Sequence, residues 1–130
     1  MELYIGGFAQ GKLDYVKGQY PEAMVYGKMN YEDILHMPRQ EKCVWNQFHS
    51  TMRQQLDRGR RPEKLRQEVL DFVDTHQEVI IISDEIGSGI VPMEEAERTY
   101  REFTGRLLTE IARKADKVVR ITCGIPTRIK

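Results

Sequence analysis

Short apolar runs alternate along the chain with stretches in which apolar residues recur every three or four positions. The runs at residues 3–5, 23–26, 79–82 and 118–122 are candidate β-strands. The third of them contains valine and isoleucine with no polar alternation, which is typical of a central strand covered on both faces. Strands that alternate with helices favour an α/β fold with a mostly parallel sheet.

The periodic stretches predict the helices. A short helix is expected from about residue 11 to residue 18, and one turn over residues 31–35 follows Asn30, a favourable N-cap residue. Three longer helices are expected further on, with these core faces: Phe48, Met52 and Leu56; Leu65, Val69, Phe72 and Val73; and Ala96, Tyr100, Phe103, Leu107, Ile111 and Ala115.

Glycine and proline mark where these helices begin and end. Gly59 is expected to end the first long helix, and Pro62 lies in the first turn of the second, where proline is tolerated. Pro92 is expected to open the longest helix, over roughly residues 93–115. Gly124 and Pro126 are expected to turn the chain into an antiparallel edge strand at residues 128–130.

Length and composition narrow the class of protein. The chain has 130 residues, of which 40% are hydrophobic and 31% charged, and this predicts one globular domain over residues 1–130. Twenty basic residues balance twenty acidic ones, which argues against a nucleic-acid-binding protein. The longest apolar run, residues 79–82, is too short for a membrane span.

The first residues and the cysteines bear on the compartment. Residues 1–5 carry no basic flank or cleavage signal, so no export is expected. Cys43 and Cys123 have no metal-binding spacing, and we expect both to be reduced and packed. Together these features predict a cytoplasmic protein.

The segment Gly6-Gly7-Phe8-Ala9-Gln10-Gly11-Lys12, called here the glycine loop, fits the pattern G-x-x-x-x-G-K between a strand and a helix. Glycines let main-chain N–H groups surround a phosphate, and the start of a helix adds partial positive charge. We therefore predict that residues 6–13 bind a nucleotide, ATP or GTP, and that Lys12 is catalytic. The structural alternative is a glycine turn with a surface lysine.

Leu13 departs from the pattern. The usual residue after the lysine is serine or threonine, whose hydroxyl binds Mg²⁺, and leucine cannot ligate a metal. Three alternatives follow: another group holds the metal, nucleotide binding is weakened, or the site is a relict.

Two acids and one histidine complete the candidate site. Asp84 and Glu85 follow the predicted central strand, at the sheet edge that carries the glycine loop if both strands are parallel. We predict that both hold Mg²⁺, with Glu85 the better candidate and also catalytic. His49, close to Asn46 at the start of a predicted helix, is a third catalytic candidate, although a lone histidine is more often a surface or cap residue.

Several stretches resemble one family. Residues 81–92 have the sequence IISDEIGSGIVP. This stretch resembles a signature of the bifunctional adenosylcobinamide kinase / adenosylcobinamide-phosphate guanylyltransferase family of cobalamin biosynthesis. Residues 100–106, 115–118 and 124–130 also look like stretches of that family, and the glycine loop is similar to its phosphate loop.

The resemblance implies a RecA-like P-loop sheet and a kinase that uses ATP or GTP with Mg²⁺ on a corrinoid substrate. It also implies a loop at residues 87–89 near the substrate, and often a homo-oligomer. It implies neither a nucleic acid polymer nor a membrane as partner.

The middle of the chain departs from the family, whose full-size members are longer. The family's H-R-x-x-R-P-x-x-W segment carries the histidine that accepts GMP, as the resemblance implies. In one register Arg58, Arg61 and Pro62 match it, but Asp57 replaces the histidine. In the preferred register residues 44–49 correspond to the family's middle strand and following helix, and His49 is the one substitute.

Three hypotheses follow from the sequence. The first is a compact kinase of this family with doubtful guanylyltransferase activity. The second is a catalytically degenerate relative that binds a nucleotide, and the third is a relict fold that binds a protein partner.

Overall fold

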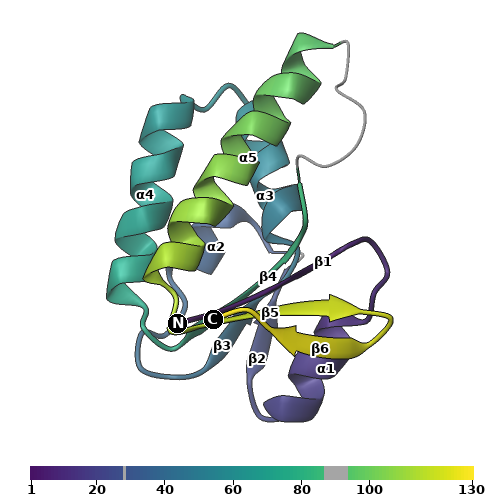
Figure 1. Ribbon diagram of the computed structural model, residues 1–130. Helices are drawn as coiled ribbons and strands as arrows, with labels where there is room; N and C mark the ends of the chain where they lie inside the picture. Colours follow the sequence, from purple (N-terminus) through teal and green to yellow (C-terminus); the bar gives the residue numbers. More distant parts are fainter. Residues whose placement is uncertain (28, 87–93) are drawn as a thin grey trace.

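The computed structural model describes residues 1–27, 29–86 and 94–130 (Figure 1). The predicted loop at residues 87–89 and Pro92 therefore lie outside the described residues. The elements, in chain order, are β1 (Glu2–Gly6), α1 (Lys12–Gln19), β2 (Met24–Tyr26), α2 (Tyr31–Leu35), β3 (Cys43–Trp45), α3 (Phe48–Asp57), α4 (Pro62–Thr75), β4 (Val79–Asp84), α5 (Glu95–Lys114), β5 (Lys117–Thr122) and β6 (Ile125–Arg128).

All six strands lie in one sheet, in the order β2-β3-β4-β1-β5-β6. The first five are parallel to one another, and β6 runs antiparallel to β5. The predicted α/β fold, with a mostly parallel sheet and an antiparallel C-terminal edge strand, is confirmed. β4 and β1 are the central pair, as the apolar run at residues 79–82 predicted.

The two faces of the sheet are covered unequally. Figure 1 shows α2, α3, α4 and α5 on one face and α1 on the other. The larger core, around Leu3, Trp45 and Ile81, lies beneath the four helices. The smaller core, around Tyr4, Ile82 and Val119, lies beneath α1. Alternate residues of β1 and β4 enter opposite cores because strand side chains alternate between faces.

The predicted helix faces agree with the structure in most positions. Phe48 and Met52 are fully buried, and Leu56 is half-buried against the larger core. Gln55, which was not predicted on this face, is buried and accepts a hydrogen bond from Arg60. The whole predicted face of α4 is buried. Asn30 caps α2 by accepting a hydrogen bond from the Asp33 main-chain N–H at 2.9 Å, as its position predicted.

The C-terminal hairpin corrects one prediction. The turn consists of Cys123 and Gly124, which both have positive φ, and the strand covers Ile125–Arg128 rather than residues 128–130. Two residues with positive φ suit the twist of a tight hairpin. Pro126 pairs with Ile121, at a position where a main-chain N–H would point away from β5. Because proline has no N–H, the outer edge of β6 has one hydrogen-bond donor fewer to offer another strand.

Two further observations concern partners and compartment. Both cysteines are free, and Cys43 is buried as predicted, but Cys123 is exposed because it lies in the hairpin turn. Across the described ranges no helix combines the length and apolarity that a membrane crossing requires.

Candidate functional site

The glycine loop connects β1 to α1 at the sheet edge where the parallel strands end. Gly6 packs so closely against β5 that an added Cβ would lie 2.4 Å from the Ile121 carbonyl oxygen. Gly11 has a φ of 84° and is the N-cap residue of α1. Glycine is therefore required at Gly6 by contact and at Gly11 by conformation. These requirements alone do not distinguish a phosphate loop from a glycine turn.

Lys12 is not the surface lysine of the structural alternative. It is 8% exposed, and its Nζ donates to the Gly7 carbonyl oxygen at 2.7 Å. The same Nζ lies 2.8 Å from Oδ1 of Asp84. A buried ammonium needs such partners, and this one is held inside the glycine loop at the first position of α1.

Asp84 and Glu85 point to different places, as strand alternation requires. Asp84 lies in the pocket with Lys12. Glu85 lines a separate hollow with Ile86 and Leu108, and its Oε1 accepts a hydrogen bond from Nε of Arg120 at 2.7 Å. Glu85 was the better candidate for the metal and for catalysis, but it is Asp84 that lines the pocket with Lys12. A metal-binding or catalytic role for Glu85 stays a prediction, and no contact in the pocket supports it.

His49 contacts Asp84 twice. The main-chain N–H of Asp84 donates to Nδ1 of His49 at 3.0 Å, and Nε2 lies 3.3 Å from Oδ2 of the carboxylate. Because Nδ1 accepts a hydrogen bond, the proton of the neutral ring is on Nε2. Burial lowers the pKa of His49 below its ordinary value, although the charge of Asp84 opposes the shift.

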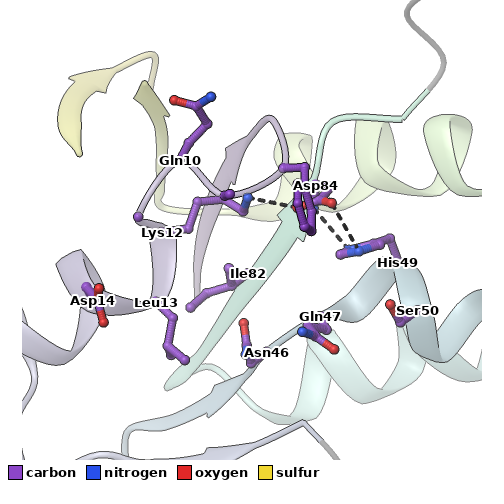
Figure 2. Close-up of a pocket in the computed structure, with 13 residues that line it drawn as sticks. Gln10, Lys12, Leu13, Asp14, Asn46, Gln47, His49, Ser50, Ile82 and Asp84 are labelled. Carbon is purple, nitrogen blue, oxygen red and sulfur yellow. Dashed lines mark hydrogen bonds and ion pairs between the residues drawn. The ribbon is translucent and has the colours of Figure 1, made fainter. Parts of the chain in front are cut away.

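These residues border one open pocket of about 530 Å³. Figure 2 shows Asp84 between Lys12 and His49, with Asn46, Gln47 and Ser50 along the neighbouring wall. The pocket is lined by residues of the glycine loop, α1, the start of α3 and the end of β4, namely Phe8, Ala9, Gln10, Gly11, Lys12, Leu13, Asp14, Asn46, Gln47, His49, Ser50, Ile82 and Asp84. The structure thus brings together the glycine loop, Asp84 and His49, but not Glu85.

Two residues give the loop an unusual surface. Leu13 lines the pocket and also packs against the smaller core, so no hydroxyl is present at that position. Phe8 is 85% exposed and forms an apolar side of the loop. The pocket therefore combines the buried Lys12 cation and two carboxylates, Asp84 and Asp14, with polar side chains and with the apolar surfaces of Phe8 and Leu13.

Sequence reasoning missed the contact between the glycine loop and the C-terminal hairpin. The Cys123 main-chain N–H donates to Oε1 of Gln10 at 2.6 Å, and the Gly124 N–H donates to the Gln10 carbonyl oxygen at 2.8 Å. Gln10 thereby fixes the loop to a turn 113 residues away in the chain. Cysteine followed by glycine between two β-branched runs was a signal for a tight turn, but nothing in the sequence paired that turn with Gln10.

A second contact that the sequence did not reveal fixes α3 against α5. Arg53 lies one turn beyond His49 and donates to Glu97 at 2.7 Å, and its guanidinium lies 4.0 Å from the centre of the Tyr100 ring. These contacts hold the helix that carries His49.

Metal ligands are sparse in this site. Within residues 1–27, 29–86 and 94–130, no group of three or more histidine, cysteine or acidic residues is arranged to hold a metal ion. Asp84 and Asp14 are the two carboxylates that line the pocket. Mg²⁺ binds nucleotides with only one or two protein carboxylates, together with phosphates and waters, so Asp84 suffices for such an ion.

Comparison with known proteins places these residues in a family. A family profile described as "Cobinamide kinase / cobinamide phosphate guanyltransferase" matches residues 38–129. The match includes His49 and Asp84 and begins after the glycine loop.

Two curated relatives carry the name "Bifunctional adenosylcobalamin biosynthesis protein CobU". The protein from Salmonella typhimurium is 36% identical over 52 residues, which are 40% of this chain and 29% of the relative. The protein from Escherichia coli is 35% identical over 52 residues, with the same shares. These alignments span less than a third of either relative, whereas the family profile covers more than two thirds of this chain. The chain therefore belongs to the cobinamide kinase / cobinamide phosphate guanyltransferase family.

Proposed function

We propose that this chain binds ATP or GTP in the pocket of the glycine loop and transfers the terminal phosphoryl group to a hydroxyl of a cobinamide-type corrinoid. The observation that carries the proposal is the buried Lys12, held between the loop and Asp84. The family description and the names of the relatives supply the corrinoid and cobalamin biosynthesis as the substrate class and pathway.

The mechanism follows from the two groups that Lys12 contacts in the structure, the Gly7 carbonyl oxygen and the Asp84 carboxylate. A nucleotide phosphate in the loop offers Lys12 more negative charge than the Gly7 carbonyl and the Asp84 carboxylate do. Lys12 would then bind the phosphates and Asp84 would be released. The corrinoid hydroxyl oxygen attacks the terminal phosphorus, the bond to the bridging oxygen breaks, and the hydroxyl proton passes to solvent. Positioning and charge neutralisation provide the acceleration.

Asp84 is the residue we assign to Mg²⁺. It lies beside Lys12, and an ion bound through water to its carboxylate would be close to the same phosphates. When bound, Mg²⁺ supplies further neutralisation of phosphate charge. Leu13 cannot contribute the usual hydroxyl, so Asp84 carries more of this role than it does in a loop with serine or threonine.

Guanylyl transfer is not part of the proposal. His49 is the one histidine that lines the pocket in the described part of the chain, and its Nδ1 lone pair accepts the Asp84 N–H. The proton of the ring is on Nε2, beside the carboxylate, so neither nitrogen offers a free lone pair to a nucleotide phosphorus.

A second candidate function is nucleotide binding without phosphoryl transfer. Leu13 favours it, since an apolar side chain lines the pocket where a metal-binding hydroxyl is usual. A protein of this kind would bind a nucleotide and would regulate another protein or assemble with it.

A phosphorylation assay separates the two functions. The parent chain is incubated with ATP or GTP labelled in the terminal phosphate, with Mg²⁺ and cobinamide or adenosylcobinamide. We expect labelled corrinoid phosphate from the parent and none from Lys12→Ala. Lys17→Ala is the matched control, because Lys17 is an exposed lysine of the same helix. Nucleotide binding without labelled corrinoid would favour the second candidate, and absence of both would contradict the two.

A further inference from the structure

We propose that His49 is a positioning residue that orients the Asp84 carboxylate in the pocket, with one oxygen toward Lys12, and that it forms no covalent bond to the nucleotide. This inference rests on the proposed function of the same pocket and deepens it, because it assigns a role to a side chain that contacts no predicted substrate atom. Three features of the geometry carry it.

The first feature is the end of the β3–β4 ladder. The pairing of β3 with β4 ends at Trp45 and Ile81, so the Asp84 main-chain N–H has no partner on β3. A donor at this depth needs an acceptor, and Nδ1 of His49 supplies it at 3.0 Å. The ring thereby fixes the backbone of the residue that carries the carboxylate.

The second feature is the division of the carboxylate oxygens. Oδ1 lies 2.8 Å from Lys12 Nζ, and Oδ2 lies 3.3 Å from His49 Nε2. The accepting Nδ1 leaves the proton on Nε2, so the N–H edge of the ring is the one that lies 3.3 Å from Oδ2. The ring therefore fixes the main chain of Asp84 and lies beside Oδ2, which leaves Oδ1 directed toward Lys12.

The third feature is the support of the ring. Its neighbour Phe48 is fully buried against Trp45, with ring centres 4.9 Å apart. One turn further on, Arg53 fixes α3 to α5 through Glu97 and Tyr100. The His49 ring is thus held on a helix that is itself fixed in place, as a residue that positions another side chain requires.

Two amide substitutions separate the two contacts of the ring. In His49→Asn, the side-chain oxygen can replace Nδ1 as acceptor but cannot reach the carboxylate. In His49→Gln, the side-chain amide can replace Nε2 as donor to Oδ2. His49→Ala removes both contacts. His36→Asn is the matched control, because His36 is exposed and its ring contacts the Glu32 carbonyl oxygen away from the pocket.

The first readout needs no nucleotide. By NMR we expect the parent ring to carry its proton on Nε2, and the Asp84 amide to exchange slowly with solvent in the parent and in His49→Asn. The Asp84 carboxylate carbon resonance should shift in His49→Asn and remain unchanged in His36→Asn. A ring protonated on Nδ1, or an unchanged carboxylate resonance in His49→Asn, would overturn the inference even if the protein has no kinase activity.

The second readout is turnover in the phosphorylation assay. We expect about a tenfold lower kcat for His49→Asn, the scale of a lost supporting contact, and a smaller loss for His49→Gln. Parental turnover in His49→Asn would mean that His49 only completes the backbone hydrogen bonds, and would overturn the inference. A nucleotide covalently attached to His49 would do the same. If the parent has no turnover, the proposed function fails and the NMR readout alone decides the role of His49.

Discussion

Two carboxylates lie at opposite ends of the same parallel sheet, and their surroundings differ. Glu2 begins β1, is 9% exposed, and accepts hydrogen bonds from Tyr4 at 2.8 Å and Tyr20 at 2.7 Å. Lys42 lies 3.5 Å from the same carboxylate. Asp84 ends β4, opens into the pocket, and contacts Lys12 and His49.

The two carboxylates differ in whether a ligand could replace the side chains that they contact. Of the two phenols around Glu2, Tyr4 is completely buried in the smaller core and Tyr20 is half-buried against it, so a ligand could not displace Tyr4 without disrupting this end of the sheet. Lys12 belongs to the glycine loop, and under the proposed function a phosphate bound there would take Lys12 from Asp84. A buried charge with fixed partners thus stabilises the fold, whereas one with an exchangeable partner makes a site. The predictions below test this distinction.

Asp84→Asn should produce the largest effect on function. It removes the charge that we assign to Mg²⁺ and to Lys12, and we expect turnover to fall roughly 100-fold, the scale of a single positioned charge in such sites. The nucleotide-free protein should also lose some stability, because the buried Lys12 keeps the Gly7 carbonyl oxygen but loses its charged partner. Glu85→Gln is the matched control, since Glu85 lies next in the chain but pairs with Arg120 outside the pocket. Equal losses in the two variants would refute the assignment of Asp84.

Glu2→Gln should give the reciprocal result. The amide cannot accept from both phenols as the carboxylate does, and hydrogen bonds to a charged group contribute about 2 kcal/mol. We expect the free energy of unfolding, measured in urea, to fall by about that amount, while nucleotide affinity of the folded protein stays unchanged. Glu78→Gln, at an exposed partner of the same Lys42, should cost little. A loss of affinity with unchanged stability would reverse the comparison.

The stability difference between the parent and Glu2→Gln should depend on pH. Burial alone would raise the pKa of Glu2, but hydrogen bonds from Tyr20 and Tyr4 and the charges of Lys42 and Lys117 lower it overall from its ordinary 4.5. The unfolded chain therefore binds the proton first as pH falls, and the stabilisation by Glu2 is complete above about pH 4.5 and lost as pH falls through the lower native value. Urea titrations of both proteins across this range measure it. A difference that stays constant on acidification would contradict the prediction.

Gln10→Ala should have the smallest effect of the four. It removes one hydrogen bond between the glycine loop and the hairpin turn but keeps the main-chain bond to Gly124. We expect a loss of about 1 kcal/mol in stability and a several-fold weaker nucleotide affinity, because the loop is held less firmly. Gln19→Ala, at an exposed glutamine of α1, is the control. An unchanged affinity would show that the hairpin does not support the loop.

Local patterns predicted the elements well because each has a local cause. The β-branched run at residues 79–82 has no stable place except a buried strand, and Asn30 is well suited to cap a helix. The strand limits at the C-terminus were wrong because Pro126 suggested a turn, whereas on an edge strand its missing N–H faces outward. Tertiary placement decided that position.

Part of the candidate site was also predictable, because that part has a local cause in the sequence. The glycine loop and Lys12 follow from a contiguous motif, but the choice between Asp84 and Glu85 depends on where each side chain points at the end of β4. The double contact of His49 with Asp84 and the Gln10–hairpin contact join residues 35 and 113 positions apart. Periodicity along the chain carries no record of such distant pairs.

The most direct test is a thermal-shift titration of the parent with ATP and with GTP, each with and without Mg²⁺, beside Lys12→Ala and Lys17→Ala. A ligand at 100 times its Kd adds about 2.7 kcal/mol to stability, enough to shift the Tm of a chain this size by several degrees. We predict a Mg²⁺-enhanced shift in the parent and in Lys17→Ala that is lost in Lys12→Ala. No shift with either nucleotide, or an equal shift in Lys12→Ala, would show that the glycine loop and Lys12 do not form a nucleotide site.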